Sequence, residues 1–216
     1  MRLYIVRHGE STGNLAGTLQ GSRVDEPLSP RGVQQAEALA ARLAAEPLDA
    51  VFSSPMLRAR QTAGILAAPH ALEIALDSDL VEFDWGIWCG QPLNEALEKE
   101  VAAIRARWRA GVLDAAPDGG ESPLRVQARA GRFLDRLRKN PSEATLVVAH
   151  GRFDRILMAT LLQRPLSRMD EIRQRNGSVS IFDWDGRDAA TPVLLDDVGH
   201  LAEALRSLAG GSDSLK

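Results

Sequence analysis

One stretch decides how this chain folds: Leu3-Tyr4-Ile5-Val6-Arg7-His8-Gly9-Glu10. Its first four residues are aliphatic or aromatic, which predicts a short buried strand. The strand ends at an arginine, a histidine and a glycine. Because ligands of open α/β sheets bind beyond the carboxyl ends of the strands, Arg7 and His8 are candidate site residues. A histidine there can act as a nucleophile, a base or a metal ligand, and the adjacent arginine favours an anionic substrate.

The composition is typical of a globular protein. The 216 residues can bury a large core, with 44% hydrophobic and 25% charged residues. A net charge of −3 gives no general attraction to nucleic acid or acidic membranes, so we expect neither as a partner. No apolar run approaches membrane-spanning length, and the first strand begins too early to leave room for a signal peptide. The single cysteine, Cys89, predicts a reducing compartment, the cytoplasm.

Strand and helix patterns alternate along the first third of the chain. Ser29-Pro30 predicts a helix start, with serine as the N-cap, and a short strand follows at residues 50–52. Ser122-Pro123, further along the chain, repeats this cap-and-proline start. Ser53-Ser54-Pro55 predicts the start of another helix, which extends to about Leu66. This order is the βαβ signature of a parallel sheet with crossover helices, so we expect an α/β fold. Residues 178–195 suggest a final β-hairpin.

Two histidines follow apolar strands at equivalent positions. His8 ends the first strand, and His150 follows the continuous apolar run Thr145–Ala149. In a parallel sheet both strand ends face the same edge, so the two imidazoles are expected to meet. A lone histidine is more often a surface or core residue than a catalyst, but two at matching strand ends favour a site.

Two more charged residues are candidates for this edge. Arg58 lies about one turn into the helix after the second strand, where the helix N-terminus and the guanidinium would both face an anion. The alternative interpretation of Arg58 is an ordinary surface arginine. Glu82 lies beside Phe83 and near Trp85, so its carboxyl group is a candidate for a raised pKa and for a general acid. The alternative interpretation of Glu82 is an exposed glutamate in a loop. The two aromatic residues suggest either an apolar wall beside the leaving group or core positions.

Together these residues would form a phosphate site. Arg7, Arg58 and a protonated His150 would neutralise the non-bridging oxygens. His8 would attack phosphorus in line, and Glu82 would protonate the leaving oxygen. Cations in these roles need no metal, and no cluster has metal-ligand spacing. We therefore expect no metal and no cofactor.

Five short motifs follow one another along almost the whole chain. They are Arg7-His8-Gly9-Glu10, Ser54-x-x-x-Arg58-Ala59-x-x-Thr62-Ala63, Leu80-x-Glu82-x-x-x-Gly86-x-Trp88-x-Gly90, Gly119-Gly120-Glu121-Ser122 and Val147-Val148-Ala149-His150-Gly151. Together they resemble the histidine phosphatase superfamily, and most closely its phosphoglycerate-mutase-like branch 1. The resemblance implies a three-layer α/β/α sandwich with a mostly parallel central sheet. It also implies a covalent phosphohistidine at His8, with Glu82 as acid and base. The positions that match phosphate or substrate contacts are Arg7, Asn14, Gln20, Arg58, His150 and Gly151.

Three functions fit this framework: a phosphomonoester hydrolase, a cofactor-dependent phosphoglycerate mutase and an inactive binding module. All the catalytic residue types are present, which disfavours the inactive module. Mutases that the motifs resemble typically follow the catalytic glutamate with arginine and carry a lysine-containing insertion. Here Phe83 follows Glu82, and no lysine lies in residues 83–98. We therefore predict a metal-independent hydrolase of a small phosphorylated metabolite, with the mutase as the alternative.

The substrate and the assembly are left open. Residues 82–90 resemble phosphoserine phosphatases, but sugar phosphates, α-ribazole phosphate and broad specificity fit as well. Arg152 and Arg155 could read a second anionic group, although we expect Arg152 at the surface. Residues 1–216 are expected to form one domain, with residues 84–123 as an insertion over the active site. The insertion contains an amphipathic helix with a solvated arginine face. A homodimer is left open.

Overall fold

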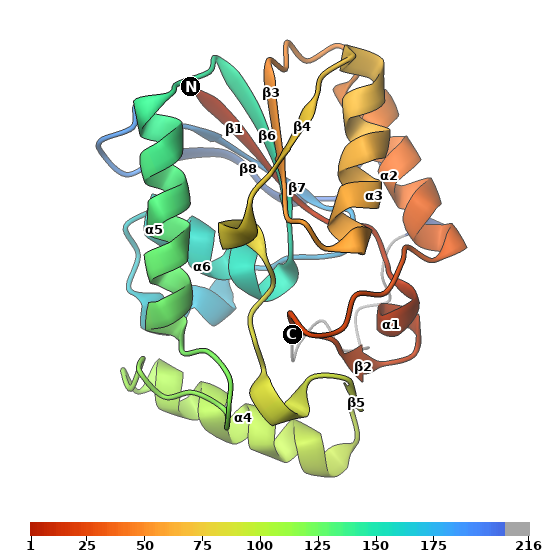
Figure 1. Ribbon diagram of the computed structural model, residues 1–216. Coiled ribbons are helices and arrows are strands. Elements are labelled where there is room, and N and C mark those ends of the chain that lie inside the picture. The colour runs from red at the N-terminus through yellow and green to blue at the C-terminus, as the bar shows by residue number, and fades with distance from the viewer. Residues whose placement is uncertain (206–216) are drawn as a thin grey trace.

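A six-stranded sheet forms the centre of the computed structural model, which describes residues 1–205 (Figure 1). Its strands, in chain order, are β1 (Arg2–Arg7), β3 (Ala50–Ser53), β4 (Ile74–Leu76), β6 (Ala144–Ala149), β7 (Val179–Asp183) and β8 (Thr191–Asp197). Their order across the sheet is β4-β3-β6-β1-β7-β8. The first four pair in parallel, whereas β7 pairs antiparallel with β1 and β8. The predicted mostly parallel sheet and the final hairpin are confirmed. A second pairing joins β2 (Thr18–Leu19) to β5 (Gln91–Pro92).

Helices cover both faces of this sheet. The helices are α1 (Thr12–Leu15), α2 (Pro30–Leu43), α3 (Leu57–Ala67), α4 (Glu95–Arg109), α5 (Pro123–Lys139) and α6 (Gly151–Leu161). Figure 1 shows α2 and α3 on one face, with α5 and α6 on the other. Leu3 and Ile5 of β1 join the core beneath α5 and α6, whereas Tyr4 and Val6 join the core beneath α2 and α3. Alternate side chains of one strand therefore fill two cores, and the three-layer sandwich is confirmed.

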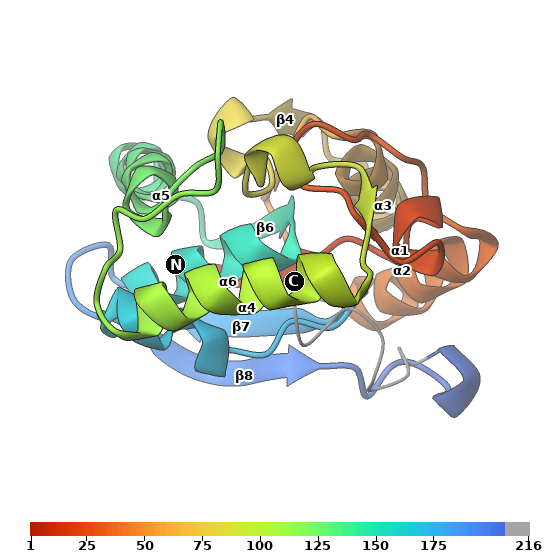
Figure 2. The same ribbon diagram turned by 90° about the horizontal axis from the view of Figure 1, so that it is seen from below.

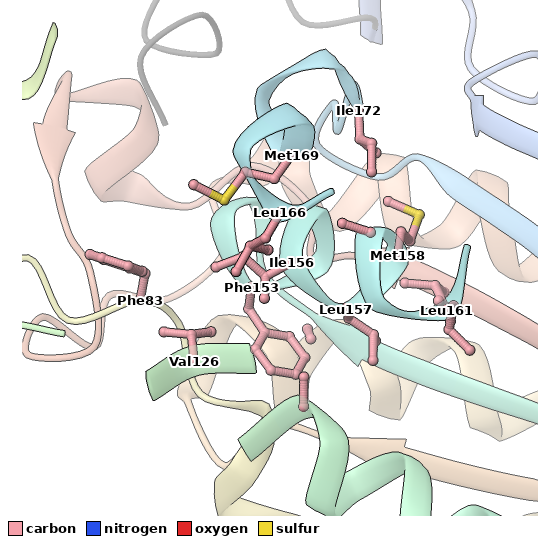
Figure 3. Packing of buried hydrophobic residues seen from close by; sticks show 14 of the residues in the cluster. Phe83, Val126, Phe153, Ile156, Leu157, Met158, Leu161, Leu166, Met169 and Ile172 are labelled. Atoms are coloured by element: carbon pink, nitrogen blue, oxygen red, sulfur yellow. The ribbon is translucent and has the colours of Figure 1, made fainter. Parts of the chain in front are cut away.

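The helix that follows β6 is buried on almost every side. Residues 151–159 of α6 are all buried. Figure 3 shows Phe153, Ile156 and Leu157 of this helix among apolar side chains that include Val126 of α5 and Met169. A helix packed all round cannot shift easily, so its first turn is a rigid support for a site. Within residues 1–205, no helix is long and apolar enough to cross a bilayer.

Residues 84–123 lie beyond the carboxyl ends of the parallel strands. Their helix α4 crosses this end of the molecule, as Figures 1 and 2 show. Val101 and Trp108 anchor the helix in the core beneath α5 and α6. The solvated arginine face predicted for α4 is wrong at Arg105. This side chain is buried, and its Nε donates to Asp170 at 2.8 Å.

Two of three predicted helix caps are present. Ser29 caps α2 by accepting the Gly32 N–H at 3.0 Å, and Ser122 caps α5 in the same way. The start predicted for α3 is wrong: the helix begins at Leu57, without a side-chain cap. The hydroxyl of Ser54 lies at the site instead, as described below.

Candidate active site

β1 and β6 end side by side. Their parallel register places Arg7 opposite Ala149, so the next residues, His8 and His150, are neighbours. The ring centroids lie 5.2 Å apart. The structure thus brings together two imidazoles that are far apart in the sequence, as the parallel register requires.

His8 presents one nitrogen with a lone pair. Its Nδ1 lies 2.6 Å from the carbonyl oxygen of Gly9, which assigns the proton to Nδ1 as a donor. Nε2 is then an acceptor, and it receives the Nε–H of Arg58 at 3.2 Å. His8 also lines a cavity at the carboxyl edge of the sheet. An imidazole in this tautomer can attack an electrophile through Nε2.

Arg58 and Arg7 supply buried positive charge to the same cavity. Arg58 lies in the first turn of α3 and donates to the carbonyl oxygens of Val24 at 2.9 Å and Gly21 at 3.0 Å. Burial lowers the pKa of Arg58 to about 10, so the group remains a cation at neutral pH. The Nη1 of Arg7 donates to the Gln174 carbonyl oxygen. Because backbone oxygens fix these groups, their charge remains available to an anion.

His150 is fully buried beside His8 and is not among the residues that line the cavity. Its Nε2 lies 2.8 Å from the Ser54 hydroxyl oxygen. Burial, followed by the positive charge of Arg58, lowers the pKa of His150 well below 6.5. Without an anion the imidazole is therefore neutral at pH 7, and the protonated His150 expected on a bound phosphate stays a prediction. A bound phosphate dianion would favour its protonated form.

The carboxylate of Glu82 faces the N-terminus of α6. Its Oε1 accepts the backbone N–H groups of Phe83 at 2.8 Å and Phe153 at 2.9 Å. Its Oε2 accepts the N–H of Arg152 at 3.2 Å. These backbone N–H groups fix the orientation of the Glu82 carboxyl group. Glu82 is half-buried and lines the cavity with His8, so the exposed-loop alternative does not hold.

A buried arginine of α5 fixes the loop that carries Glu82. Arg129 donates to the carbonyl oxygens of Val81 at 2.6 Å and Glu82 at 3.1 Å. It also pairs with the Glu121 carboxylate at 3.1 Å. The Gly-Gly-Glu-Ser motif and the Glu82 motif are therefore joined through one guanidinium. Arg129 is not recognisable as a site residue from the sequence, because its local pattern is that of an ordinary amphipathic helix.

The other predicted contacts lie at the cavity only in part. Asn14 and Gln20, from the loop after β1, both line it. Gln20 is oriented by its Nε2, which donates to the Ser11 hydroxyl at 2.8 Å. Gly151 is not among the lining residues and lies against Arg7 instead. A Cβ at Gly151 would come within 3.1 Å of the Arg7 Nε, so glycine allows this close approach.

Trp85 and Arg152 also line the cavity, together with Leu19 and Gly21. Trp85 therefore fits the predicted apolar wall although it also packs in the core, whereas Phe83 belongs to the core alone. The surface position expected for Arg152 is wrong, since its side chain is fully buried. One sequence feature could have indicated a cavity position for Arg152: it lies in the first turn of the helix that follows the His-Gly motif.

The rest of the described chain offers no competing centre of this kind. A larger cavity lies at the opposite edge of the sheet, lined by residues such as Met1, Arg2 and Asp183. None of the predicted site residues is part of it. Within residues 1–205, no group of three histidine, cysteine or acidic side chains is arranged to hold a metal ion.

Comparison with known proteins assigns the family. The sequence model of the histidine phosphatase superfamily (branch 1) matches residues 3–197. The chain belongs to this family. This histidine phosphatase is 35% identical over 204 residues to phosphoserine phosphatase 1 from Hydrogenobacter thermophilus. The match covers 94% of this chain and 95% of that protein. The chain is 31% identical over 215 residues to a probable phosphoglycerate mutase from Proteus mirabilis, covering 94% and 96% of the two chains.

A solved structure supports the same assignment. The α-ribazole phosphatase from Shigella flexneri superposes with a TM-score of 0.80 at 29% sequence identity. The match covers 91% of this chain and 96% of the other. The family and the fold predicted from the five motifs are confirmed.

Proposed function

We propose that this histidine phosphatase hydrolyses the phosphomonoester of a small metabolite through a phosphohistidine at His8. The observation that carries the proposal is the Nε2 lone pair of His8 in a cavity that Arg7, Arg58 and Glu82 also line. The relatives named as phosphoserine and α-ribazole phosphatases support hydrolysis of a small phosphorylated metabolite. The relative named as a probable phosphoglycerate mutase makes isomerisation the second candidate.

The first chemical step transfers the phosphoryl group to the protein. Arg7 and Arg58 hold the non-bridging oxygens, and His8 Nε2 attacks phosphorus while the ester P–O bond breaks. Glu82, in its acid form, gives its proton to the leaving oxygen. The Gly9 carbonyl oxygen, which accepts the Nδ1–H at 2.6 Å, stabilises the positive charge that develops on the imidazole.

The second step releases phosphate. The Glu82 carboxylate takes a proton from a water molecule, whose oxygen attacks the phosphorus of phosphohistidine. The N–P bond breaks, and the electron pair returns to His8 Nε2. Inorganic phosphate leaves, and Glu82 is again in its acid form.

The surroundings of Glu82 favour hydrolysis over isomerisation. The next residue, Phe83, is fully buried in the core, so this position supplies no cation to the cavity. A mutase must hold the second phosphate of its bisphosphate intermediate while it excludes water. Residues 83–98 contain no lysine to contribute to that task.

A phosphatase screen tests the proposal. Wild-type protein should release phosphate from p-nitrophenyl phosphate and from members of a metabolite panel, with or without a chelator. His8→Ala should abolish turnover, whereas His70→Ala, at a histidine outside the cavity, should not. Activity that a chelator removes and Mg²⁺ restores would refute metal independence. Interconversion of phosphoglycerates, primed by the bisphosphate and faster than phosphate release, would favour the mutase.

We propose, in addition, a cytoplasmic location and one domain over residues 1–216, with residues 84–123 as an insertion over the active site. The single cysteine supports the reducing compartment. The core beneath α5 and α6 supports one domain, because it takes in residues of the insertion as well as of the sheet. A homodimer stays a prediction that light scattering during gel filtration would test.

A further inference from the structure

Arg152 is a buried arginine at the wall of the cavity. Its side chain is 0% exposed, yet the residue lines the cavity together with His8 and Glu82. Its backbone N–H donates to Glu82 Oε2, so the side chain originates beside the proposed acid. The guanidinium carbon lies 5.6 Å from the ring centroid of Trp85 and 5.7 Å from that of Trp108. These two indole rings fix the group by cation–π contact.

Only one nitrogen of the Arg152 guanidinium donates a hydrogen bond to a residue within 1–205. Nη1 pairs with Asp170, while Nε and Nη2 are buried without a hydrogen-bond partner in this part of the chain. Nε and Nη2 form the side-on edge that binds a carboxylate through two parallel hydrogen bonds. Arg2 shows this mode with Asp183, at 2.9 Å and 3.1 Å. Buried donors of this kind are expected to have an acceptor, which a ligand can supply.

The surroundings of Arg152 carry excess positive charge. Asp170 pairs with Arg105 at 2.8 Å and with Arg152, while Arg109 and Arg155 lie 3.4 Å and 3.8 Å away. Burial opposes ionisation of Asp170, but Arg152 and Arg105 hold its pKa below the ordinary value. Asp170 thus faces four guanidinium groups. An additional anion at the cavity wall would offset part of this excess.

We propose that Arg152 binds a carboxylate on the leaving alcohol, so that the preferred substrates are phosphomonoesters of small hydroxy acids. This inference rests on the proposed phosphatase function. With the phosphoryl group held by Arg7 and Arg58, Glu82 marks the side from which the alcohol leaves. Arg152 lies on that side because its backbone N–H donates to Glu82 Oε2. Its side-on edge fits a planar carboxylate in this position.

Matched substrates test the inference. 3-Phosphoglycerate and glycerol 3-phosphate differ only in a carboxylate against a hydroxymethyl group. Phosphoserine and phosphoethanolamine differ only in the presence of the carboxylate. In at least one pair, the wild-type kcat/KM should favour the carboxylate by about tenfold or more, as expected for a charge-assisted bidentate pair. Arg152→Met should reduce this ratio about tenfold, mainly through KM, and Arg152→Lys should reduce it less.

Arg109→Met is the matched control. Arg109 also pairs with Asp170, but its side chain is 53% exposed and the residue does not line the cavity. This variant should leave the substrate ratios unchanged. If neither pair shows a carboxylate preference in the wild type, the inference is overturned, whether or not Arg152→Met folds. An unchanged ratio in folded Arg152→Met overturns it as well. In both cases hydrolysis of p-nitrophenyl phosphate would leave the proposed function standing, whereas its absence would refute that function.

Discussion

Replacing Glu82 by glutamine separates the chemistry of its carboxyl group from its shape. A glutamine oxygen in the place of Oε1 can still accept the N–H groups of Phe83 and Phe153. The amide nitrogen then faces the N–H of Arg152, which loses its acceptor. Because this site is partly buried, the cost lies near the lower end of the range for an unsatisfied donor, about 1 kcal/mol. For a chain of this size, that corresponds to a fall in Tm of about 2–4 °C.

The kinetic loss should be larger and should depend on the leaving group. General acid–base catalysis contributes roughly 100- to 10,000-fold, so Glu82→Gln should slow hydrolysis of an alkyl phosphate by a factor in this range. p-Nitrophenolate leaves without a proton, so His8 should still be phosphorylated rapidly by p-nitrophenyl phosphate. The phosphohistidine should then persist, since no base activates water. A burst of nitrophenolate equal to the enzyme concentration should follow.

Stopped-flow absorbance measures this burst directly. Glu95→Gln, at an exposed carboxylate of α4, is the control and should behave as the wild type. Alkyl phosphate turnover by Glu82→Gln within threefold of the wild-type rate would remove Glu82 from the acid role. A slow reaction of the variant without any burst would show that Glu82 is not the base for the second step.

Substitutions at three other positions test the surroundings of the site. Burial and the nearby Glu82 raise the pKa of Asp154 well above 3.8, so the folded protein keeps its proton while the unfolded chain loses it above that pH. The unfolding free energy of Asp154→Asn should therefore increase relative to that of the wild type as pH rises, by up to about 1.4 kcal/mol per pH unit. Urea unfolding measures this difference between variant and wild type, and the same difference at pH 4 and pH 8 would refute the prediction. Ser54→Ala removes the 2.8 Å partner of His150 and should lower kcat/KM about fivefold, with Ser54→Thr restoring activity if the hydroxyl is what matters. Arg129→Met leaves the carbonyl oxygens beside Glu82 without their donor and should lower the unfolding free energy by about 3 kcal/mol together with kcat; unchanged unfolding would contradict the support role.

Features that depend on local pattern were predictable from the sequence. The apolar run before Arg7 predicted a buried strand, and its match with the run before His150 predicted that both imidazoles lie at one edge. Both predictions need only the parallel register of neighbouring strands. The caps at Ser29 and Ser122 are equally local, because a serine hydroxyl accepts an N–H three residues further on.

Features that depend on distant partners were not predictable. Asp170, which pairs with Arg105 and Arg152, lies 65 and 18 residues away from them, so neither arginine could be recognised as buried from its own helix. The hydroxyl of Ser54 serves a histidine 96 residues away instead of a helix end. The charge state of His150 follows from its complete burial beside Arg58, which a strand-end motif does not reveal.

The most direct measurement is the identity of the phosphorylated atom. Glu82→Gln mixed with p-nitrophenyl phosphate, quenched within one turnover under alkaline conditions and digested, should give one phosphoryl group per chain. Tandem mass spectrometry should place it on His8, with the Nε2 isomer assigned by ³¹P NMR of the denatured protein, and His8→Ala should carry none. A phosphoryl group on another residue, or product formation in a single wild-type turnover without any phosphoprotein, would contradict the assignment of His8 as the nucleophile.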